Sequence, residues 1–437
     1  IVRTKVDIKA LESLYDRDIF SLNSIQLFLG DMHKNGRTVS FVTFNNGFKI
    51  VYKPRSLENE NSFQKFIDFL NTSGSDINIG FPKILTREEY GWMEFIEYNE
   101  VANLKEIESH YHNIGKILCV FYLLGTHDIM PDNIILRGNK PYFIDLECLL
   151  NKPIKSGYSK NIISNIFQSV LSVGILPFWA QGNDMERDLV RSVLYGANQQ
   201  KIKSVVWKNK NTDKMEQEVN EVFAGNGSIE THLPSFEGTQ YNLNYNYYLK
   251  LREGFIEQYK FFQNNKDSVL ERINSDVFKN TFIRFIIHNT SVYDLLLRDS
   301  IIPECLQGDE NIESIINRLF EVVKKPLSKK LAKSIKEQIN VGDIPYFYTY
   351  NEINTSLYAS NNDIISQNYF DKIYTGTYMA IERLKNLSQQ DLNLQLNIID
   401  ISCKYSFEIF KIDCPKEINF ITPEKWKNSI SETSNNF

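Results

Sequence analysis

The N-terminal part of the chain changes its hydrophobic period from helical to alternating, which predicts one helix followed by a small sheet. Apolar side chains recur at roughly helical spacing from Val6 to Leu14, so we expect a helix within residues 1–21. Residues 25–55 hold three short apolar runs separated by the turns G-D-M-H-K-N-G and N-N-G. An N-G turn between such runs is typical of a β-hairpin, and the pattern predicts three strands.

Further along, the pattern alternates between helix and strand and then becomes mostly helical. Residues 58–71 and 103–125 have apolar side chains at helical spacing, and the second run is apolar enough to be a buried helix. Residues 83–98 predict two more strands that end in a hinge at Glu94–Tyr98. The remaining predicted elements are a helix, an irregular segment and a second helix within 151–235, helices from Tyr241, charged helices over 309–340, a helix near 367–387, a last helix from Gln389 to Cys403 and a linker after Pro415.

Composition places the chain among ordinary globular proteins of two or three domains. It has 437 residues, of which 42% are hydrophobic and 24% charged, and its formal net charge is −5. This charge gives no electrostatic reason to expect nucleic acid as a partner. The five cysteines are widely spaced without a C-x-x-C pattern, which argues against a zinc site and a disulfide framework.

Cysteine usage and the length of apolar runs also predict the cellular location of the protein. Cysteine usage suits a reducing compartment, and no apolar run is long enough to span a bilayer. No signal peptide is recognisable, so we expect a soluble, cytoplasmic protein. Because the chain begins at Ile1 rather than Met, we expect it to be part of a longer protein.

The stretch from Asp128 to Glu147 has the order of polar residues that phosphoryl transfer to a hydroxyl requires. Asn133 follows Asp128, and two apolar runs joined by a G-N-K turn lead to Asp145 and Glu147. Protein kinases use this order: an Asp that orients the acceptor hydroxyl, an Asn for a metal ion, and an Asp after a strand for the second metal contact. Mg²⁺ prefers hard oxygen ligands. The stretch therefore predicts a site for ATP and Mg²⁺, with the hinge at Glu94–Tyr98 contacting the adenine.

Lys53 ends the third predicted strand, where kinases place the lysine that pairs with nucleotide phosphates. Taken alone, it is equally well interpreted as a solvated lysine on an edge strand, and the downstream Asp and Asn residues favour phosphate binding. The turn at 30–36 has the position of a phosphate-covering loop, but it carries Asp31 and His33 where a kinase has G-x-G. Helix 58–71 would correspond to the αC helix of kinases.

Together with two later stretches, these motifs resemble the dehydratase domain of class II lanthipeptide synthetases, the LanM-type lantibiotic-modifying enzymes. The stretches are G-D-M-H-K-N-G-R-T-V, V-Y-K-P-R-S-L, D-I-M-P-D-N with P-Y-F-I-D-L-E, R-F-I-I-H-N-T-S-V-Y and G-D-I-P-Y-F. They follow the family's order from residue 30 to 347, and the similarity extends to 389–399. Each motif alone is weak, whereas five in order are highly specific.

The resemblance implies an α+β fold like that of lipid and protein kinases, with a β-rich N-lobe in 1–98, a helical C-lobe in 99–350, and further helices and a linker in 351–437. It also implies that Ser and Thr side chains of a ribosomal precursor peptide, made of leader and core, are phosphorylated with ATP and Mg²⁺. The phosphate is then eliminated to leave dehydroalanine or dehydrobutyrine. The complete family enzyme adds a zinc-dependent cyclase domain. This chain lacks its Cys-His pattern, so we expect no zinc here and a cyclase domain or partner elsewhere.

Carried over residue by residue, the resemblance gives roles to the motifs of the first half of the chain. These roles concern the nucleotide, the metal ion and the acceptor hydroxyl. They are Lys53 for the nucleotide phosphates, Asn133 and Asp145 for Mg²⁺ with Glu147 in support, Asp128 for the hydroxyl, and Asp31 and His33 as active-site residues of the loop over the phosphates.

Arg284 and Thr290 match the Arg and Thr that serve phosphate elimination in this family. A guanidinium holds a leaving phosphate through two charge-assisted hydrogen bonds, and a hydroxyl adds another. Taken alone, Arg284 would more often be a structural ion pair, and the family pattern favours function. Glu337 is a loose match to a family glutamate, and we interpret His288 as a half-buried structural residue.

Met130 departs from the family pattern D-x-H-x-x-N, because a thioether neither donates a hydrogen bond nor titrates. His127 lies beside Asp128 and is the substitute that the sequence offers. Two other interpretations stay open: a peptide kinase without elimination, and a non-catalytic module that binds a precursor or partner. Retention of the kinase-type residues argues against the second.

Overall fold

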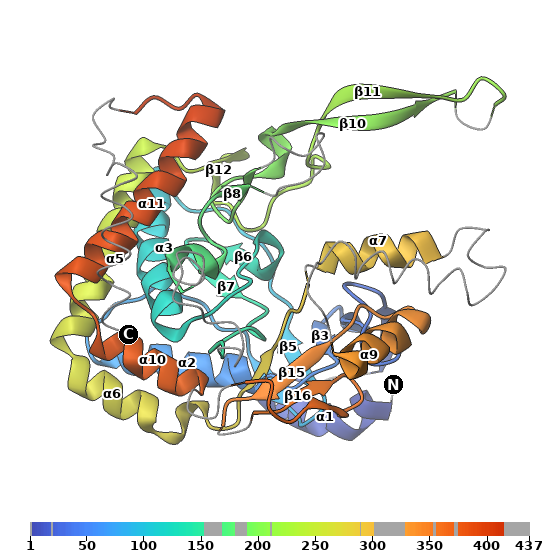
Figure 1. Ribbon diagram of the computed structural model, residues 1–437, viewed down its shortest axis with the longest axis horizontal. Coiled ribbons are helices and arrows are strands. Elements are labelled where there is room, and N and C mark those ends of the chain that lie inside the picture. The colour runs from blue at the N-terminus through green and yellow to red at the C-terminus, as the bar shows by residue number, and fades with distance from the viewer. Residues whose placement is uncertain are drawn as a thin grey trace.

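The computed structural model describes residues 2–18, 21–152, 168–179, 190–209, 212–288, 290–300, 328–352, 355–370 and 375–414. Within these ranges the protein is α+β, which confirms the predicted class. A helical body lies on one side of the molecule, and the two larger sheets lie on the other (Figure 1). No helix in the described ranges combines the length and the apolar character needed to cross a membrane.

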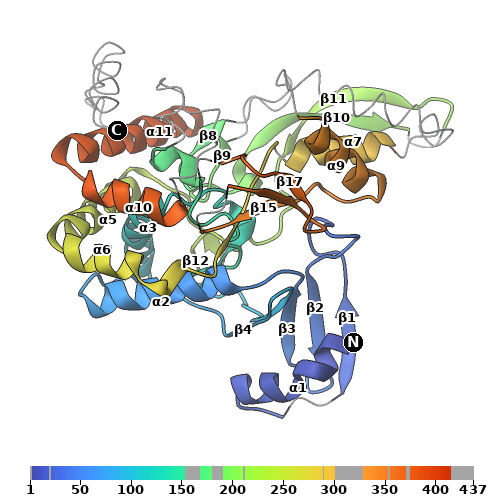
Figure 2. The ribbon, with the colours of Figure 1, turned by 60° about the horizontal axis from the view of Figure 1, so that its bottom comes forward.

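The N-terminal sheet presents one face to a helix and the other to the rest of the molecule (Figure 2). On the first face Leu11 packs with Phe44 and Trp92. Because side chains alternate across a strand, Val51 and Lys53 point to the opposite face. The elements are α1 (Val2–Tyr15), β1 (Leu22–Gln26), β2 (Ser40–Phe44), β3 (Lys49–Lys53), β4 (Ile84–Thr86) and β5 (Gly91–Glu94), with the antiparallel strand order β1-β2-β3-β5-β4.

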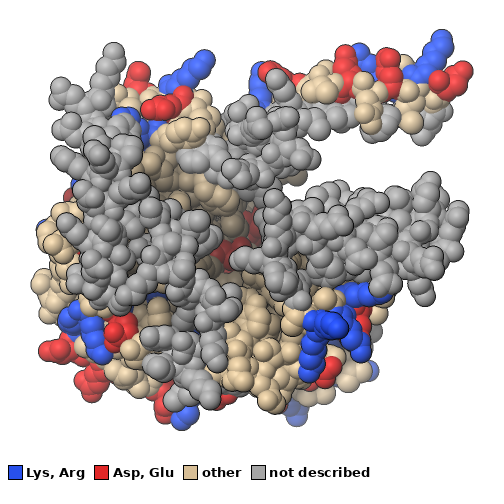
Figure 3. Space-filling model, viewed as in Figure 1, with Lys and Arg blue, Asp and Glu red and all other residues tan. Residues whose placement is uncertain are grey.

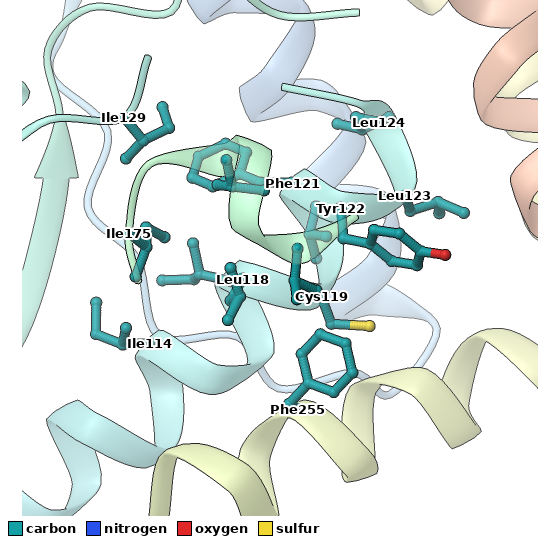
Figure 4. Packing of buried hydrophobic residues seen from close by; sticks show 14 of the residues in the cluster. Ile114, Leu118, Cys119, Phe121, Tyr122, Leu123, Leu124, Ile129, Ile175 and Phe255 are labelled. Carbon is teal, nitrogen blue, oxygen red and sulfur yellow. The ribbon is translucent and has the colours of Figure 1, made fainter. Parts of the chain in front are cut away.

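The helical body is centred on one helix that is buried on almost every side, as the sequence predicted. Gly115 and Gly254 allow it to approach its neighbour closely, because a Cβ atom on Gly115 would lie 1.9 Å from a backbone oxygen across the contact. Figure 4 shows Phe255 against Cys119 in this core. The helices are α2 (Glu58–Thr72), the central α3 (Leu104–Leu124), its neighbour α5 (Tyr245–Asn264), α6 (Lys266–Asn274), α10 (Gly376–Lys385) and α11 (Gln389–Phe410).

The segment between α3 and α5 differs from its prediction. The helix expected before Gly225 is wrong: β10 (Lys201–Lys208) and β11 (Glu216–Phe223) form a long antiparallel hairpin that projects from the body (Figure 1). Apolar residues in both runs recur at intervals of three and four, as in a helix, so the hydrophobic pattern did not reveal the hairpin. A polar turn separates the two runs. The expected preceding helix falls largely on 153–167, outside the described residues.

Several short elements complete this middle region. They are η1 (Pro131–Asn133), β6 (Ile134–Arg137), β7 (Lys140–Phe143), η2 (Val170–Val173), β8 (Phe178–Trp179), β9 (Val190–Arg191), η3 (Ala197–Gln199), β12 (Ser235–Phe236), β13 (Thr239–Gln240) and η4 (Asp276–Phe278). The predicted turn between the apolar runs of the Asp128–Glu147 stretch is the hairpin turn joining β6 and β7, where Gly138 adopts a positive φ.

A second sheet, with the strand order β14-β15-β16-β17, lies beside the N-terminal sheet (Figure 2). Tyr293 and Ile335 from two helices pack on one of its faces against Phe347 and Leu357. The helix expected near 367–387 begins only at Gly376, after a strand of this sheet. The elements are β14 (Phe282–Arg284), α7 (Thr290–Ser300), α9 (Lys329–Asn340), β15 (Phe347–Tyr350), β16 (Leu357–Ala359) and β17 (Ile364–Ser366). The predictions for 309–327 and for the tail after Pro415 lie outside the described residues.

Candidate active site

One cavity of about 800 Å³ lies among the N-terminal sheet, the β6–β7 hairpin and the start of α7. Acidic atoms are visible in the hollow at the middle of the face shown in Figure 3. All nine side chains singled out in the sequence line this cavity. They are Asp31, His33, Lys53, Asp128, Asn133, Asp145, Glu147, Arg284 and Thr290.

One part of the cavity is an apolar slot. Val51 and Met93 reach it from the sheet face opposite to α1, and Ile144 lines it from the segment after β7. Residues 94–98 line the same cavity, in the position predicted for a hinge. An apolar slot with polar groups at one end is an environment that suits a purine ring.

Lys53 lies at the polar end of this slot. It is 5% exposed, and its Nζ donates a hydrogen bond to the carbonyl of Ile144. Burial lowers the pKa of Lys53, while Asp145 acts in the opposite direction. The side chain is therefore a buried lysine that faces the cavity rather than a solvated one.

Arg55 is buried among three carboxylates. Its guanidinium contacts both oxygens of Glu60 at 3.1 and 2.6 Å and Oδ1 of Asp145 at 2.7 Å. Its Nε lies 3.4 Å from Oε2 of Glu147. Burial disfavours the charged form, but the three carboxylates outweigh it and raise the pKa of Arg55. This side chain links α2 to the segment after β7 that carries Asp145.

The pKa values of Asp128 and Asp145 are shifted in opposite directions. Burial raises the pKa of Asp128 to about 6, with Arg284 opposing the rise and Asp145 adding to it. For Asp145, burial is outweighed by Arg55 and Lys53, which lower its pKa to about 2. One carboxyl thus titrates near neutral pH and the other stays ionised, a separation suited to a proton acceptor beside a cation ligand.

Asn133 and Asp145 supply the oxygen atoms that suit Mg²⁺. The amide nitrogen of Asn133 donates to the backbone carbonyl of Asp128 at 3.0 Å, which fixes the amide so that its oxygen is the remaining acceptor. Together with the ionised Asp145, this donor set fits a Mg²⁺ ion that completes its shell with water and phosphate oxygens. No group of three His, Cys, Asp or Glu side chains within the described ranges is arranged to hold a metal ion.

Glu147 organises a second group of side chains in the cavity. Nη1 of Arg284 lies 2.6 Å from Oε1 of Glu147, and the Tyr346 hydroxyl donates to Oε2 at 3.2 Å. Nδ1 of His33 lies 2.7 Å from the carbonyl of Ile344, so this nitrogen carries the proton, and Nε2 lies 3.5 Å from Nη2 of Arg284. Burial and the charge of Arg284 lower the pKa of His33, which keeps the imidazole neutral.

Sequence comparison identifies the family of this chain and one relative. The model of a family described as "Domain of unknown function (DUF4135)" matches residues 1–350. The chain belongs to this family. It is also 28% identical over 398 residues to the lacticin 481/lactococcin biosynthesis protein LcnDR2 of Lactococcus lactis subsp. lactis. That match covers 87% of this chain and 41% of the relative, so the chain spans less than half the relative's length.

The main residue of this DUF4135 site that sequence analysis missed is Arg55. The motif V-Y-K-P-R-S-L contains it, yet only Lys53 received a role. Its position two residues beyond Lys53, which ends β3, and within the same motif was an available signal. Its partner Glu60 is 5% exposed and lies on α2, the helix predicted to correspond to αC.

The turn at 30–36 is held down by the G-D-I-P-Y-F motif. The carboxylate of Asp343 accepts hydrogen bonds from the backbone N–H groups of Asn35 at 2.6 Å and Gly36 at 2.8 Å. Both donors have positive φ angles, and consecutive N–H groups in that conformation form a small anion-binding nest. Asp343 occupies the nest, so these two N–H groups serve the turn itself.

Three residues considered from sequence do not line the cavity. His127 contacts the side chain of Asn151 at 2.8 Å, so it does not replace the family histidine, whereas Met130 does line the cavity. Glu337 forms an exposed ion pair with Lys333. The ring of His288 packs 6.0 Å from that of Tyr293, a residue of the cluster between α7, α9 and the second sheet.

Proposed function

We propose that this chain is a lanthipeptide dehydratase with a kinase-like fold. It phosphorylates Ser and Thr side chains of a ribosomal precursor peptide with ATP, and then eliminates the phosphate to leave dehydroalanine or dehydrobutyrine. The five motifs and the similarity to a protein named for lacticin 481/lactococcin biosynthesis support this assignment. We assign the N-lobe to residues 1–98, the C-lobe to 99–350 and a further part of the dehydratase to 351–437.

The observation that carries the proposal is that two sets of side chains, suited to different chemical steps, line one cavity. Lys53, Asp128 and Asp145 form a kinase-type set, and Arg284 with Thr290 forms an anion-binding set on the same cavity. A kinase that only phosphorylates has no chemical need for the second set. Elimination needs it, because a phosphate that leaves as an anion requires cationic stabilisation.

In the first step Asp128 accepts the proton of the acceptor hydroxyl, a role suited to its pKa of about 6. Lys53 pairs with the nucleotide phosphates at the polar end of the apolar slot. Asn133 and Asp145 would hold Mg²⁺, which supplies charge neutralisation to the phosphoryl group being transferred. Glu147 keeps Arg284 in place through the contact of 2.6 Å.

In the second step a base removes the Cα proton of the phosphorylated residue. The electrons of that C–H bond form the Cα=Cβ bond, and the Cβ–O bond breaks with release of phosphate. Neutral His33 is placed to accept the proton at Nε2, because Nδ1 is already bonded to Ile344. Arg284 and Thr290 stabilise the leaving phosphate, and Asp31 lines the same cavity.

The test is mass spectrometry of a precursor peptide incubated with ATP and Mg²⁺ and either the wild type or the Arg284→Ala variant. We expect the wild type to remove one water per modified residue and the variant to add phosphoryl groups without removing water. Phosphoryl addition by both proteins would identify a kinase without elimination. An unchanged peptide together with absent ATP binding would identify a non-catalytic module.

A further inference from the structure

A second cleft of about 630 Å³ adjoins the candidate active site. Lys34, Arg55 and Tyr346 line both the cleft and the cavity, so these three side chains form the partition between them. Arg55 and Tyr346 are buried, and Lys34 lies over the Tyr346 ring at 5.0 Å. A group bound in the cleft would therefore lie one side chain away from the candidate reaction centre.

One wall of the cleft is the face of the second sheet opposite to α7 and α9. Strand alternation directs Phe347 and Leu357 toward those helices and the neighbouring tyrosines toward the other face. On that face the ring of Tyr348 lies 5.5 Å from that of Tyr350 and 5.4 Å from that of Tyr358. Tyr350 is 41% exposed, so the tyrosine surface is accessible.

The other walls offer hydrogen-bonding groups without a dominant charge. They come from the turn at 30–36, the β4–β5 turn and the β16–β17 turn. Two of the cations are already neutralised, Arg55 by its three carboxylates and Arg87 by Asp7 at 2.7 Å. The other charged wall residues are Lys34 and Arg37 with Glu58, Glu88 and Glu89, so positive and negative charges nearly balance. The uncharged amide and hydroxyl residues of these walls are Asn35, Ser56, Thr86, Asn280, Ser360, Asn361 and Asn362.

We propose that this cleft binds an extended segment of the precursor peptide, next to the Ser or Thr that reacts in the cavity. The inference rests on the proposed function, because a peptide whose side chain reacts in the cavity must place its flanking residues nearby. Tyrosine rings give large contact areas at small entropic cost, and amide and hydroxyl groups pair with a peptide backbone. The cleft therefore favours an extended polar peptide over a compact anion.

The experiment measures binding and turnover separately. The probe is a Ser- and Thr-containing lanthipeptide precursor, made of leader and core, with an N-terminal fluorescent label for anisotropy. Tyr350→Ala removes an exposed ring from the cleft, and Asn280→Trp fills the cleft from an exposed position. The matched control is Tyr405→Ala on α11, a tyrosine 48% exposed that does not line the cleft.

We expect both cleft variants to weaken peptide binding and raise the KM for the peptide by about tenfold, the loss typical of a tyrosine that carries binding energy or of a blocked cleft. The affinity of both cleft variants for ADP should stay at the wild-type level. The control variant should bind the peptide as the wild type does. Wild-type affinity in both cleft variants, with dehydration intact, overturns the inference and leaves the proposed function standing. If the cleft variants bind the peptide more weakly but the wild type does not modify it, the result supports peptide binding in the cleft and contradicts the proposed function.

Discussion

Nη2 of Arg55 lies 2.7 Å from Oδ1 of Asp145, and the same guanidinium holds Glu60 of α2 through two hydrogen bonds. In protein kinases the lysine of the third strand pairs with a glutamate of the αC helix. Here Glu60 of α2, the helix predicted to correspond to αC, pairs with Arg55, and Lys53 donates to the backbone carbonyl of Ile144 instead. The position of α2 is thereby coupled directly to the carboxylate proposed to hold Mg²⁺.

Arg55→Met should strongly destabilise the protein. The change leaves Glu60, Asp145 and Glu147 buried together without their shared cation. Breaking a buried ion pair from one side costs about 3–5 kcal/mol. The measurement is the free energy of unfolding in urea. Lys333→Met is the control, because its exposed pair with Glu337 should contribute less than about 1 kcal/mol. Equal losses in both variants would contradict the structural role of Arg55.

Phosphorylation should depend on one group with a pKa of about 6. Burial raises the pKa of Asp128, and its carboxylate form is the one that accepts a proton. The rate of ADP release should therefore fall by about tenfold per pH unit below that value. Because Arg284 lowers the pKa of Asp128, Arg284→Ala should move the profile to higher pH. A profile that is flat through pH 6, or the same in both proteins, would exclude Asp128 as the base.

Asp343→Asn should loosen the turn at 30–36. An asparagine oxygen can accept from one of the two N–H groups of Asn35 and Gly36, but its NH₂ group repels the other. Loss of one such bond is worth about 1–2 kcal/mol, which corresponds to roughly a tenfold weaker affinity for ADP in calorimetry. Asp363→Asn, in an exposed turn, is the control and should bind ADP as the wild type does. Unchanged affinity in Asp343→Asn would show that the nucleotide does not depend on this turn.

Met130→His should raise the rate of phosphorylation. Met130 lines the cavity and neither donates nor titrates, whereas His127 is engaged with Asn151 elsewhere. An imidazole near Asp128 adds one hydrogen bond of about 1 kcal/mol, or about a fivefold higher kcat. Met130→Leu is the control, because it changes shape without adding a donor. A rate in Met130→His no higher than in Met130→Leu would show that the position needs no imidazole.

The sequence by itself determined the elements whose local pattern is unambiguous. The buried helix of 103–125, the N-N-G hairpin and the apolar runs around the G-N-K turn all agree with α3, β2–β3 and β6–β7. These segments are specified by neighbouring residues, through hydrophobic period and turn chemistry. The same reasoning failed at β10–β11, because the apolar residues of both runs have helical spacing and only the pairing of the two strands makes them a hairpin.

Only the tertiary structure decided which polar residues meet. Asp343 reaches across more than three hundred positions to hold Asn35 and Gly36, and no local pattern records such a pairing. The charges of Arg55 and Lys53 outweigh burial and set the pKa of Asp145 near 2, whereas burial near other carboxylates sets the pKa of Asp128 near 6. Both are aspartates in one short stretch of sequence. Their chemistry differs because solvation and neighbouring charge are properties of the folded environment.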